Sequence, residues 1–505
     1  MKYSTLFIVS FVVVSLFSFA YATRPAKRSV TIKDVPLAMC SPTARDIEAL
    51  PEFVSTPTYQ LAFAEPLHIR KNVSSLKVTD PILIAFKKGI VEMKKRPASD
   101  PTSWTYQAAI HGTTAQPALP AWNSCVHGTQ FFLSWHRMYL YFFERILRKA
   151  SGDKNFALPY WDWSQTDGYN LPATFISPKS EALNPLFQAS RDPTMNIGGV
   201  IAKAIVKNNL TDAMLSRSML MPDSRGFPSF NAALEKVHGQ IHIAVGGSEG
   251  LMRALKTAAQ DPIFWMHHNN IDHLWEKWMR QNNPQLPSAN DPWMKEKFVF
   301  FDENGKKVTM SGKDVVNVAQ QLKYKYDDID IKSDTGNDFG PVFGIEAPPE
   351  MPTTLATSND VQLSADKNVF ILSPTPEAST AKLAYGRFML TFEKIKLKGW
   401  ANGSFELYLN QDINETPDSD NSNYIGSVDF FGLTDNEASS ETHNVKAKNQ
   451  IFDATTALRA YLSKNPKLGD LRVTIYHRLP EVNGVSQPQK LAVQASVGAV
   501  RLEKR

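Results

Sequence analysis

Two groups of three histidines are the residues in this chain best suited to chemistry. The first group lies in and just before a stretch crowded with aromatic residues, NSCVHGTQFFLSWHRMYLYFFER (123–145). Imidazole among so much apolar surface must be satisfied either by a hydrogen bond or by a metal ion. The positions are His111, His127 and His136 in the first group, and His238, His242 and either His267 or His268 in the second.

Histidines without acidic neighbours restrict the choice of metal. Imidazole suits zinc, copper, nickel and iron, whereas magnesium and calcium require oxygen ligands. Carboxylate-bridged di-iron sites carry Glu-x-x-His pairs on two helices, and among the clustered histidines only His238 has a glutamate, Glu235, three residues before it. A zinc hydrolase needs one three-ligand site and a base. Two facing sites of three nitrogens therefore favour a copper pair, with a zinc-loaded structural protein as the alternative.

The helices that must position these histidines are visible in the apolar pattern. His238 and His242 are four residues apart, so one face of a helix presents both rings; a solvent-exposed pair is the alternative to a metal site. The segment 131–150 is apolar nearly all round and should be buried. Asp261 can cap the last helix. The predicted helices span 80–96, 131–150, 229–245 and 261–281.

The pattern changes in the last third of the chain. A Pro-, Thr- and Ser-rich segment, IEAPPEMPTTLATSND (345–360), is typical of a linker. The runs of alternating apolar and polar residues that follow are typical of an antiparallel sandwich, and they span 386–399, 403–412, 424–433, 471–479 and 489–502. The predicted fold class is α+β, a mainly α-helical core built on a four-helix bundle followed by a C-terminal antiparallel β-sandwich.

The first residues predict export. MKYSTLFIVSFVVVSLFSFAYA (1–22) combines a lysine, an apolar run and Ala-Tyr-Ala, the layout of a secretory signal. A membrane anchor is the alternative, but the run is short for one. Four sequons are compatible with secretion to an extracellular or secretory-pathway compartment, at Asn72, Asn209, Asn402 and Asn414. The net charge of +5 and the lack of a long basic block argue against nucleic acid as a partner.

Four segments closely resemble a known family. WNSCVHGTQFFLSWHRMYLYFFERIL, ALPYWDW, LEKVHGQIHIAVGG and DPIFWMHHNNIDHLW are similar to the copper-binding regions of tyrosinases, catechol oxidases and molluscan haemocyanins, the type 3 binuclear copper proteins. The resemblance covers residues 65–280 strongly and the C-terminal part loosely. It implies two copper ions per chain, the first bound by His111, His127 and His136, and the second by His238, His242 and His268, the second residue of the histidine pair.

The resemblance also implies a reaction and a domain organisation. O2 would be the co-substrate, and o-diphenols would be oxidised to o-quinones while O2 is reduced to water. Small phenols are the expected partners, with no membrane after signal removal and no expectation for the oligomeric state. Reversible O2 binding, as in haemocyanins, is the alternative, but a single copy of each copper segment favours an enzyme. The expected segments are a signal (1–22), an irregular leader (23–64), a catalytic domain (65–344), a linker (345–360) and a β domain (361–505).

Further roles follow from the same resemblance. Glu235 matches a glutamate proposed to hold the water that takes a monophenol's proton. Gly239 stands where a second water-orienting residue, an asparagine, would be, so diphenol oxidation should exceed monophenol hydroxylation. Asp261 and Asp272 are expected to orient the copper ligands, with a plain helix cap as the alternative for Asp261. The candidates for the substrate pocket are Trp135, Gly239, Met252, Phe264 and Trp265; ordinary core packing is the alternative for the aromatic residues.

Two more expectations concern Cys125 and the β domain. Cys125 precedes His127 by two residues, the spacing at which some family members carry a thioether; a disulfide to Cys40 or an inert thiol are the alternatives. The β domain is expected to shield the site, through a bulky apolar residue in YIGSVDFFGL (424–433), until the linker is cut. A β domain that only packs on the core is the alternative.

Overall fold

A computed structural model describes most of the chain. It covers residue 59, residues 65–330 and residues 352–505, apart from gaps at 202–209, 211–212, 215–218, 221–228, 248–249, 283, 285, 364–366, 380, 382, 384–385, 400–403, 413–417, 434–446, 479–480, 483–484 and 487–492. The predicted signal, nearly all of the leader, Cys40, three of the sequons (Asn209, Asn402 and Asn414) and residues 345–351 of the predicted linker lie outside the described residues. We call residues 65–330 the helical part and residues 352–505 the β part.

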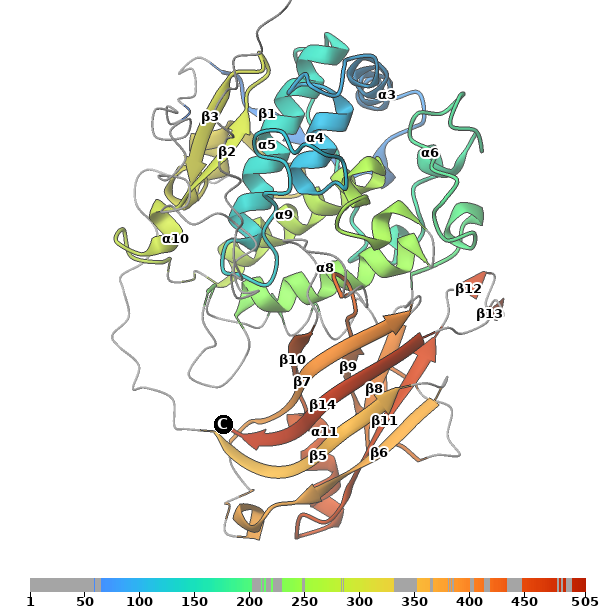
Figure 1. The fold of residues 1–505 in the computed structure, drawn as a ribbon, viewed down its shortest axis with the longest axis vertical. Coiled ribbons are helices and arrows are strands. Elements are labelled where there is room, and N and C mark those ends of the chain that lie inside the picture. The colour runs from blue at the N-terminus through green and yellow to red at the C-terminus, as the bar shows by residue number, and fades with distance from the viewer. Residues whose placement is uncertain are drawn as a thin grey trace, which may run out of the picture. The chain divides into compact units, whose positions relative to one another are not determined.

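Long helices build the helical part (Figure 1). They are α3 (Pro81–Lys94), α4 (Trp104–His111), α5 (Phe132–Ser151), α8 (Phe230–Gly246) and α9 (Ile263–Asn282). Asp80, Ser103 and Ser229 each begin a helix by accepting a hydrogen bond from a backbone N–H of its first turn. The four helices predicted from periodicity are confirmed. The eight-residue α4 carries too little periodicity to be found that way.

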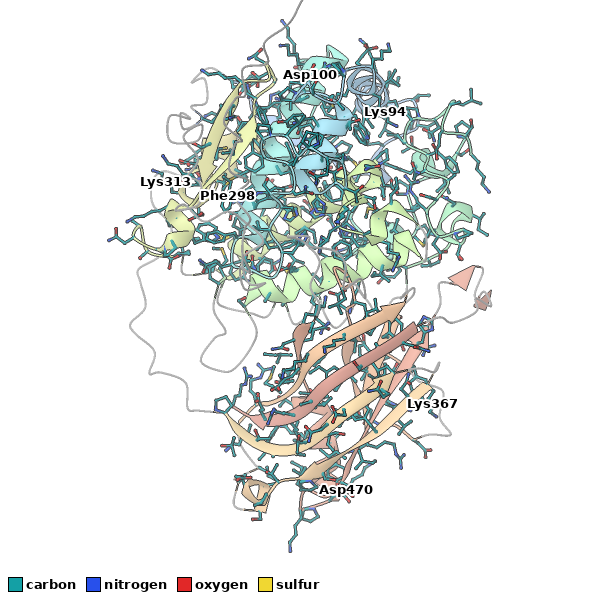
Figure 2. All side chains as sticks on the ribbon, viewed as in Figure 1. Lys94, Asp100, Phe298, Lys313, Lys367 and Asp470 are labelled. Atoms are coloured by element: carbon teal, nitrogen blue, oxygen red, sulfur yellow. The ribbon has the colours of Figure 1, made fainter. Side chains whose placement is uncertain are left out.

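Helix α5 forms the centre of the helical part. It is buried along most of its length, and it packs against α3, α8 and α9. Aromatic rings fill the space between α5 and α9, where Phe143 stacks on Trp265 with ring centroids 3.4 Å apart. Charged side chains such as Lys94 and Lys313 lie at the periphery (Figure 2). The side chains of α5 are therefore held in a rigid apolar environment.

Short elements complete the helical part. A hairpin pairs β2 (Lys297–Phe301) with β3 (Lys307–Ser311), and β1 (His68–Arg70) runs parallel to β4 (Tyr324–Tyr326). The β1–β4 pair joins the two ends of the helical part. The remaining short helices are α6 (Ala173–Ile176), α10 (Pro292–Lys295), η1 (Val73–Ser75), η2 (Thr166–Gly168), η3 (Met195–Ile197), η4 (Leu251–Arg253), η5 (Ala258–Gln260), η6 (Gly312–Asp314) and η7 (Val318–Leu322).

A buried ion network ties the β1–β4 pair to α5 and α9. Arg70 donates to Glu144 Oε2 at 2.8 Å and to Asp272 Oδ2 at 3.2 Å, and its guanidinium lies 3.5 Å from the centre of the Tyr324 ring. Arg137 pairs with the other oxygen of Asp272. All four charged groups are buried, so loss of one partner would leave a charge uncompensated in the core.

The β part is an antiparallel sandwich, as predicted. Strand pairing runs in the order β10-β7-β14-β5-β6-β11-β8-β9, and β6 joins the two layers because only two of its residues pair with β5. The strands and helices are β5 (Thr353–Leu363), β6 (Lys367–Pro374), η8 (Pro376–Ser379), β7 (Phe388–Gly399), β8 (Ser404–Leu409), β9 (Tyr424–Val428), β10 (Lys448–Asp453), α11 (Thr455–Lys464), β11 (Leu471–Arg478), β12 (Glu481–Val482), β13 (Val485–Ser486) and β14 (Val493–Lys504).

The predicted linker boundary differs from the structure. Strand β5 begins at Thr353, inside the segment 345–360 that composition assigned to a linker. The threonines that suggested a linker are β-branched, and this shape favours a strand once a neighbour such as β14 pairs with it. Among the described residues, no helix is both long and apolar enough to cross a bilayer.

Candidate metal centre

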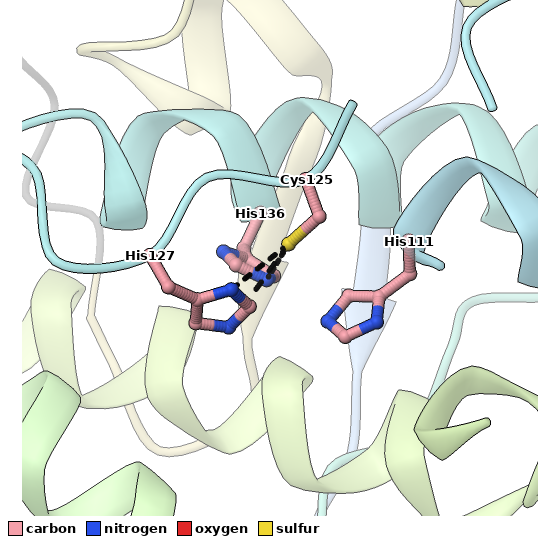
Figure 3. Close-up of side chains that lie close together, drawn as sticks. All are labelled: His111, Cys125, His127 and His136. Atoms are coloured by element: carbon pink, nitrogen blue, oxygen red, sulfur yellow. Dashed lines mark hydrogen bonds between the residues drawn. The ribbon is translucent and has the colours of Figure 1, made fainter. Parts of the chain in front are cut away.

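The first three histidines lie together with Cys125 (Figure 3). His111 is the last residue of α4, His127 lies in the connection to α5, and His136 lies in the second turn of α5. One ligand atom from each of the four residues can be chosen so that all lie within 4.8 Å of one another. His111, Cys125 and His136 are buried, and His127 is half-buried. We call these three histidines the first trio.

The second cluster joins α8 to α9. His238 and His242 project from one face of α8, and His267 and His268 lie on α9. The His268 Nε2 atom is 3.3 Å from His238 Nε2 and 3.2 Å from His242 Nε2. Three ring nitrogens thus converge on one point, an arrangement that a shared metal ion satisfies.

Backbone carbonyls fix the tautomers of the rings. His111 Nδ1 lies 2.8 Å from Leu255 O, His136 Nδ1 lies 2.8 Å from Phe132 O, and His242 Nδ1 lies 2.6 Å from Met252 O. A carbonyl can only accept, so each Nδ1 carries the ring proton and each Nε2 keeps its lone pair for a metal. Gly112 permits this arrangement beside His111, since a Cβ there would lie 2.6 Å from Leu255 O.

Burial also keeps the rings uncharged. Desolvation lowers the pKa of His136 to about 3, and it lowers the pKa of His238, His242 and His268 well below the ordinary value. The rings are therefore neutral at pH 7, the form that binds metal. Neutral imidazoles without a carboxylate among them suit copper, so the residues present fit a copper pair.

The structure favours His268 over His267 as a copper ligand. Trp163 Nε1 donates to His267 Nδ1 at 3.0 Å, while the Nε2 atom of His268 points at those of His238 and His242. The His267 ring instead stacks against the His238 ring, with centroids 5.2 Å apart. This position fits a supporting role.

The two histidine clusters face each other, and one aromatic ring lies beside both. The rings of His136 and His268 are stacked, with centroids 4.4 Å apart. Phe264, one turn before His268, lies 4.1 Å from the His268 ring and 4.8 Å from the His111 ring. Phe264 thus borders both clusters, and its contacts with Tyr139 and Trp265 also match core packing.

Other pocket candidates have different surroundings. Trp265 stacks on Phe143 in the core, and Trp135 packs on Tyr139 as well as on the His136 ring. These contacts match ordinary core packing for both tryptophans. Met252 contributes the carbonyl that holds His242.

Neither aspartate orients a copper ligand by direct contact, contrary to expectation. Asp261 forms a bidentate pair with Arg191, at 2.6 and 2.8 Å, and caps α9 through Ile263 N–H. The side chain of Asp272 faces the buried arginines rather than the histidines. Each carboxylate pairs with a buried guanidinium, because leaving either the carboxylate or the guanidinium buried without a partner would cost free energy of folding.

A residue of the β part also reaches the histidines. The Phe431 ring is stacked on the His242 ring, with centroids 4.2 Å apart and an interplanar angle of 19°, and it meets the His238 ring edge-on at 5.4 Å. Ile243 and Leu255 complete an apolar cluster around Phe431. Sequence reasoning pointed to the segment 424–433, but nothing in its pattern distinguishes Phe431 from its neighbours.

Comparison with known proteins assigns the family. Family models match at residues 101–216 and 202–281 (common central domain of tyrosinase), 288–333 (polyphenol oxidase middle domain) and 352–489 (domain of unknown function, DUF7868). Tyrosinase HcTyr1 from Hahella sp. (strain CCB-MM4) is 32% identical over 415 residues, which cover 72% of this chain and 85% of that protein. The chain belongs to the tyrosinase family. It is therefore an oxidoreductase with a binuclear copper centre.

Plant members of the tyrosinase family are also similar. The latent polyphenol oxidase of Prunus armeniaca is 26% identical, and the match covers 71% of this chain and 66% of the relative. Aureusidin synthase of Antirrhinum majus is 29% identical, with 50% and 51% covered. This chain thus spans between half and two thirds of the length of these plant relatives. The latent apple tyrosinase structure shares the fold, with a TM-score of 0.60, 20% identity, and 89% and 100% of the two chains covered.

These relatives overturn the prediction of secretion. The enzymes from Prunus armeniaca, Larrea tridentata, Malus domestica and Spinacia oleracea are named chloroplastic, which points to a plastid. A lysine, an apolar run and small residues describe a segment that passes through a membrane, but they do not specify which membrane. The sequons do not restore the prediction of export. Asn72, the one sequon among the described residues, has a structural use of its own, because its side chain caps η1.

We predict that Cys125 is covalently joined to His127. The Cys125 sulfur lies 3.2 Å from His127 Nδ1 and 4.0 Å from His127 Nε2, so it faces the ring edge that carries the carbon between those nitrogens. After strong reduction and alkylation, peptide mapping should find the two residues cross-linked and Cys125 unmodified. An alkylated Cys125 in copper-loaded protein would contradict the prediction.

Proposed function

We propose that this chain is a latent phenol oxidase that converts o-diphenols to o-quinones, with small phenols as its partners. The observation that carries the proposal is the pair of buried histidine clusters that face each other beside Phe264. When bound, the copper pair would supply the redox chemistry, in which two diphenols give up two electrons and two protons each and one O2 is reduced to two water molecules. The protein's own part is to hold neutral imidazoles in place, stack the substrate ring and exclude water.

The surroundings of Glu235 and Gly239 support diphenols over monophenols. Glu235 Oε1 accepts a hydrogen bond from Gly128 N–H at 2.6 Å, and burial raises the pKa of Glu235 to about 8. A carboxyl with that pKa is mostly protonated at neutral pH, and a neutral carboxyl holds and polarises a proton-accepting water less strongly than a carboxylate does. Gly239 has no side chain with which to position a water molecule.

The proposal predicts that catechol turnover clearly exceeds tyramine turnover. Oxygen uptake with each phenol, measured on copper-loaded protein after the β part is detached, tests it. Equal rates for tyramine and its catechol would contradict the preference. Failure of both phenols to be oxidised by fully loaded protein would contradict the proposed function and favour reversible O2 binding.

Replacing Gly239 with asparagine is expected to raise monophenol hydroxylation relative to diphenol oxidation in the detached helical part. The asparagine amide would supply the water-orienting group that glycine lacks. The intact chain is unsuitable for this test, because a Cβ at position 239 would lie 2.6 Å from an Asp429 oxygen. An unchanged ratio of the two activities would contradict the expectation.

Latency is the second part of the proposal. The Phe431 ring lies flat on His242, a ring that we assign to the second copper, and it occupies space that a substrate ring would use. Several contacts hold the β part against α8, among them a hydrogen bond of 2.7 Å from Gln240 Nε2 to Ser427 O and the Lys236 ammonium 3.6 Å from the centre of the Phe452 ring. Release of the β part would expose the site.

A further inference from the structure

The residue two before Phe431 is a buried carboxylate with several partners. Asp429 Oδ1 accepts a hydrogen bond from Phe431 N–H at 2.9 Å, so its side chain closes the turn that presents the phenylalanine. Its other oxygen pairs with the Lys448 ammonium. The exposed fraction of Asp429 is 6%, so salt screens the carboxylate of this pair less than it would screen a surface charge.

Strand β10 holds this turn from both ends. The Lys448 ammonium also donates to Phe431 O at 3.1 Å, so one lysine bridges the carboxylate and the carbonyl of the covering residue. Gln450, two residues along β10, accepts from Asp429 N–H at 3.0 Å and donates to Asp429 O. Four polar groups of the segment 429–431 are thus bonded to two side chains of one strand.

The same carboxylate meets α8, the helix that carries His238 and His242, at a glycine. A Cβ built on Gly239 would lie 2.6 and 2.7 Å from the two Asp429 oxygens and 2.8 Å from the carbon between them. Real Cβ atoms essentially never make such contacts, and here the carboxylate has little freedom to retreat because Lys448 and Phe431 N–H hold it. Residue 239 must therefore be glycine for the turn at 429–431 to pack against α8.

We propose that Asp429, held by Lys448 and seated against Gly239, is the positioning residue that places Phe431 over the second copper site. This inference rests on the proposed latency and extends it. Gly239 then has two effects. Its lack of a side chain lets the turn at 429–431 pack against α8, and it leaves no group at this position to orient a water molecule. A side chain that favoured monophenols would displace the cover, so in this chain substrate choice and latency are coupled.

The test compares full-length, copper-loaded variants that carry a specific protease site inserted between Asp330 and Thr353. Latency is the ratio of catechol turnover after cutting and removal of the β part to turnover before. Lys448→Met and Asp429→Ala should each raise the turnover of the uncut chain about threefold or more, since a loosened cover is open for a larger share of the time. Lys396→Met, a lysine of β7 that no described contact ties to the helical part, is the matched control and should leave latency unchanged.

A double-mutant cycle tests the seat at Gly239. Gly239→Ala alone should reduce latency strongly, and it should have little further effect in the Asp429→Ala background, because the clashing carboxylate is gone. Each variant is compared with its own cut form, so any direct effect of residue 239 on the copper site cancels. Additive effects would overturn the proposed contact.

Hydrogen exchange on the metal-free protein provides a readout independent of activity. In Lys448→Met, the amides of 424–433 should exchange faster while β7 and β14 keep their protection. Faster exchange throughout the β part would show general destabilisation and overturn the positioning role, as would unchanged exchange together with unchanged latency. If the wild-type chain is not latent, the covering role fails, and exchange alone decides whether Lys448 holds the segment.

Discussion

Replacing His242 with alanine is expected to abolish catechol oxidation and to reduce the copper content from two ions per chain towards one. His242 Nε2 is one of three nitrogens that converge within 3.3 Å, and a site with two imidazoles loses both affinity and geometry. Metal analysis after dialysis, together with oxygen uptake on catechol, measures both effects. His136→Ala should have the same consequence at the first trio.

The control for this prediction is His477→Ala. His477 lies outside both clusters and stacks on Phe405 in the β part, with ring centroids 4.5 Å apart. This variant should keep its full copper content. Retention of two coppers and of turnover in His242→Ala would contradict the ligand assignment. One zinc or iron ion per chain in the wild type would contradict the copper centre itself.

Detaching the β part, or replacing Phe431 with alanine in the intact chain, is expected to raise catechol turnover about tenfold or more. The two changes act on the same obstruction, because both remove the ring stacked on His242. In the Phe431→Ala variant, cutting at the inserted protease site should therefore raise catechol turnover only slightly, because the uncut variant is already active. Copper content should stay constant throughout.

Phe370→Ala is the matched control for the phenylalanine. Phe370 is half-buried on β6 and packs against Phe392 within the β part. This variant should stay as latent as the wild type. If the wild-type chain showed equal catechol turnover before and after a clean cut, the β part would have a packing role alone.

Local patterns predicted the elements that carry the site but not the contacts between distant segments. The spacing of His238 and His242 on an apolar helix, and the aromatic burial of the helix that contains His136, follow from periodicity. The resemblance then supplied the assignment of each group to one copper ion and the choice of His268 over His267. Asp272 was misjudged because its partners, Arg70 and Arg137, come from segments far away in the chain.

The same limit applies to the β part. Alternating residues predicted its strands, yet threonine-rich composition hid the start of β5 at Thr353. The role of Phe431 depends on a turn that Lys448 and Gln450 close from another strand, and no local pattern records such a closure. The glycine at 239 was noticed for the side chain it lacks, but its fit to Asp429 is a tertiary contact.

One short segment holds a ring of each histidine cluster. The carbonyl of Met252 accepts from His242, and the carbonyl of Leu255, three residues later, accepts from His111. An ion bound at either cluster would restrain its own histidine ring and, through this segment, the ring that the segment holds in the other cluster. Loading of the empty protein is therefore expected to be cooperative, with a sigmoidal copper titration and few half-loaded chains.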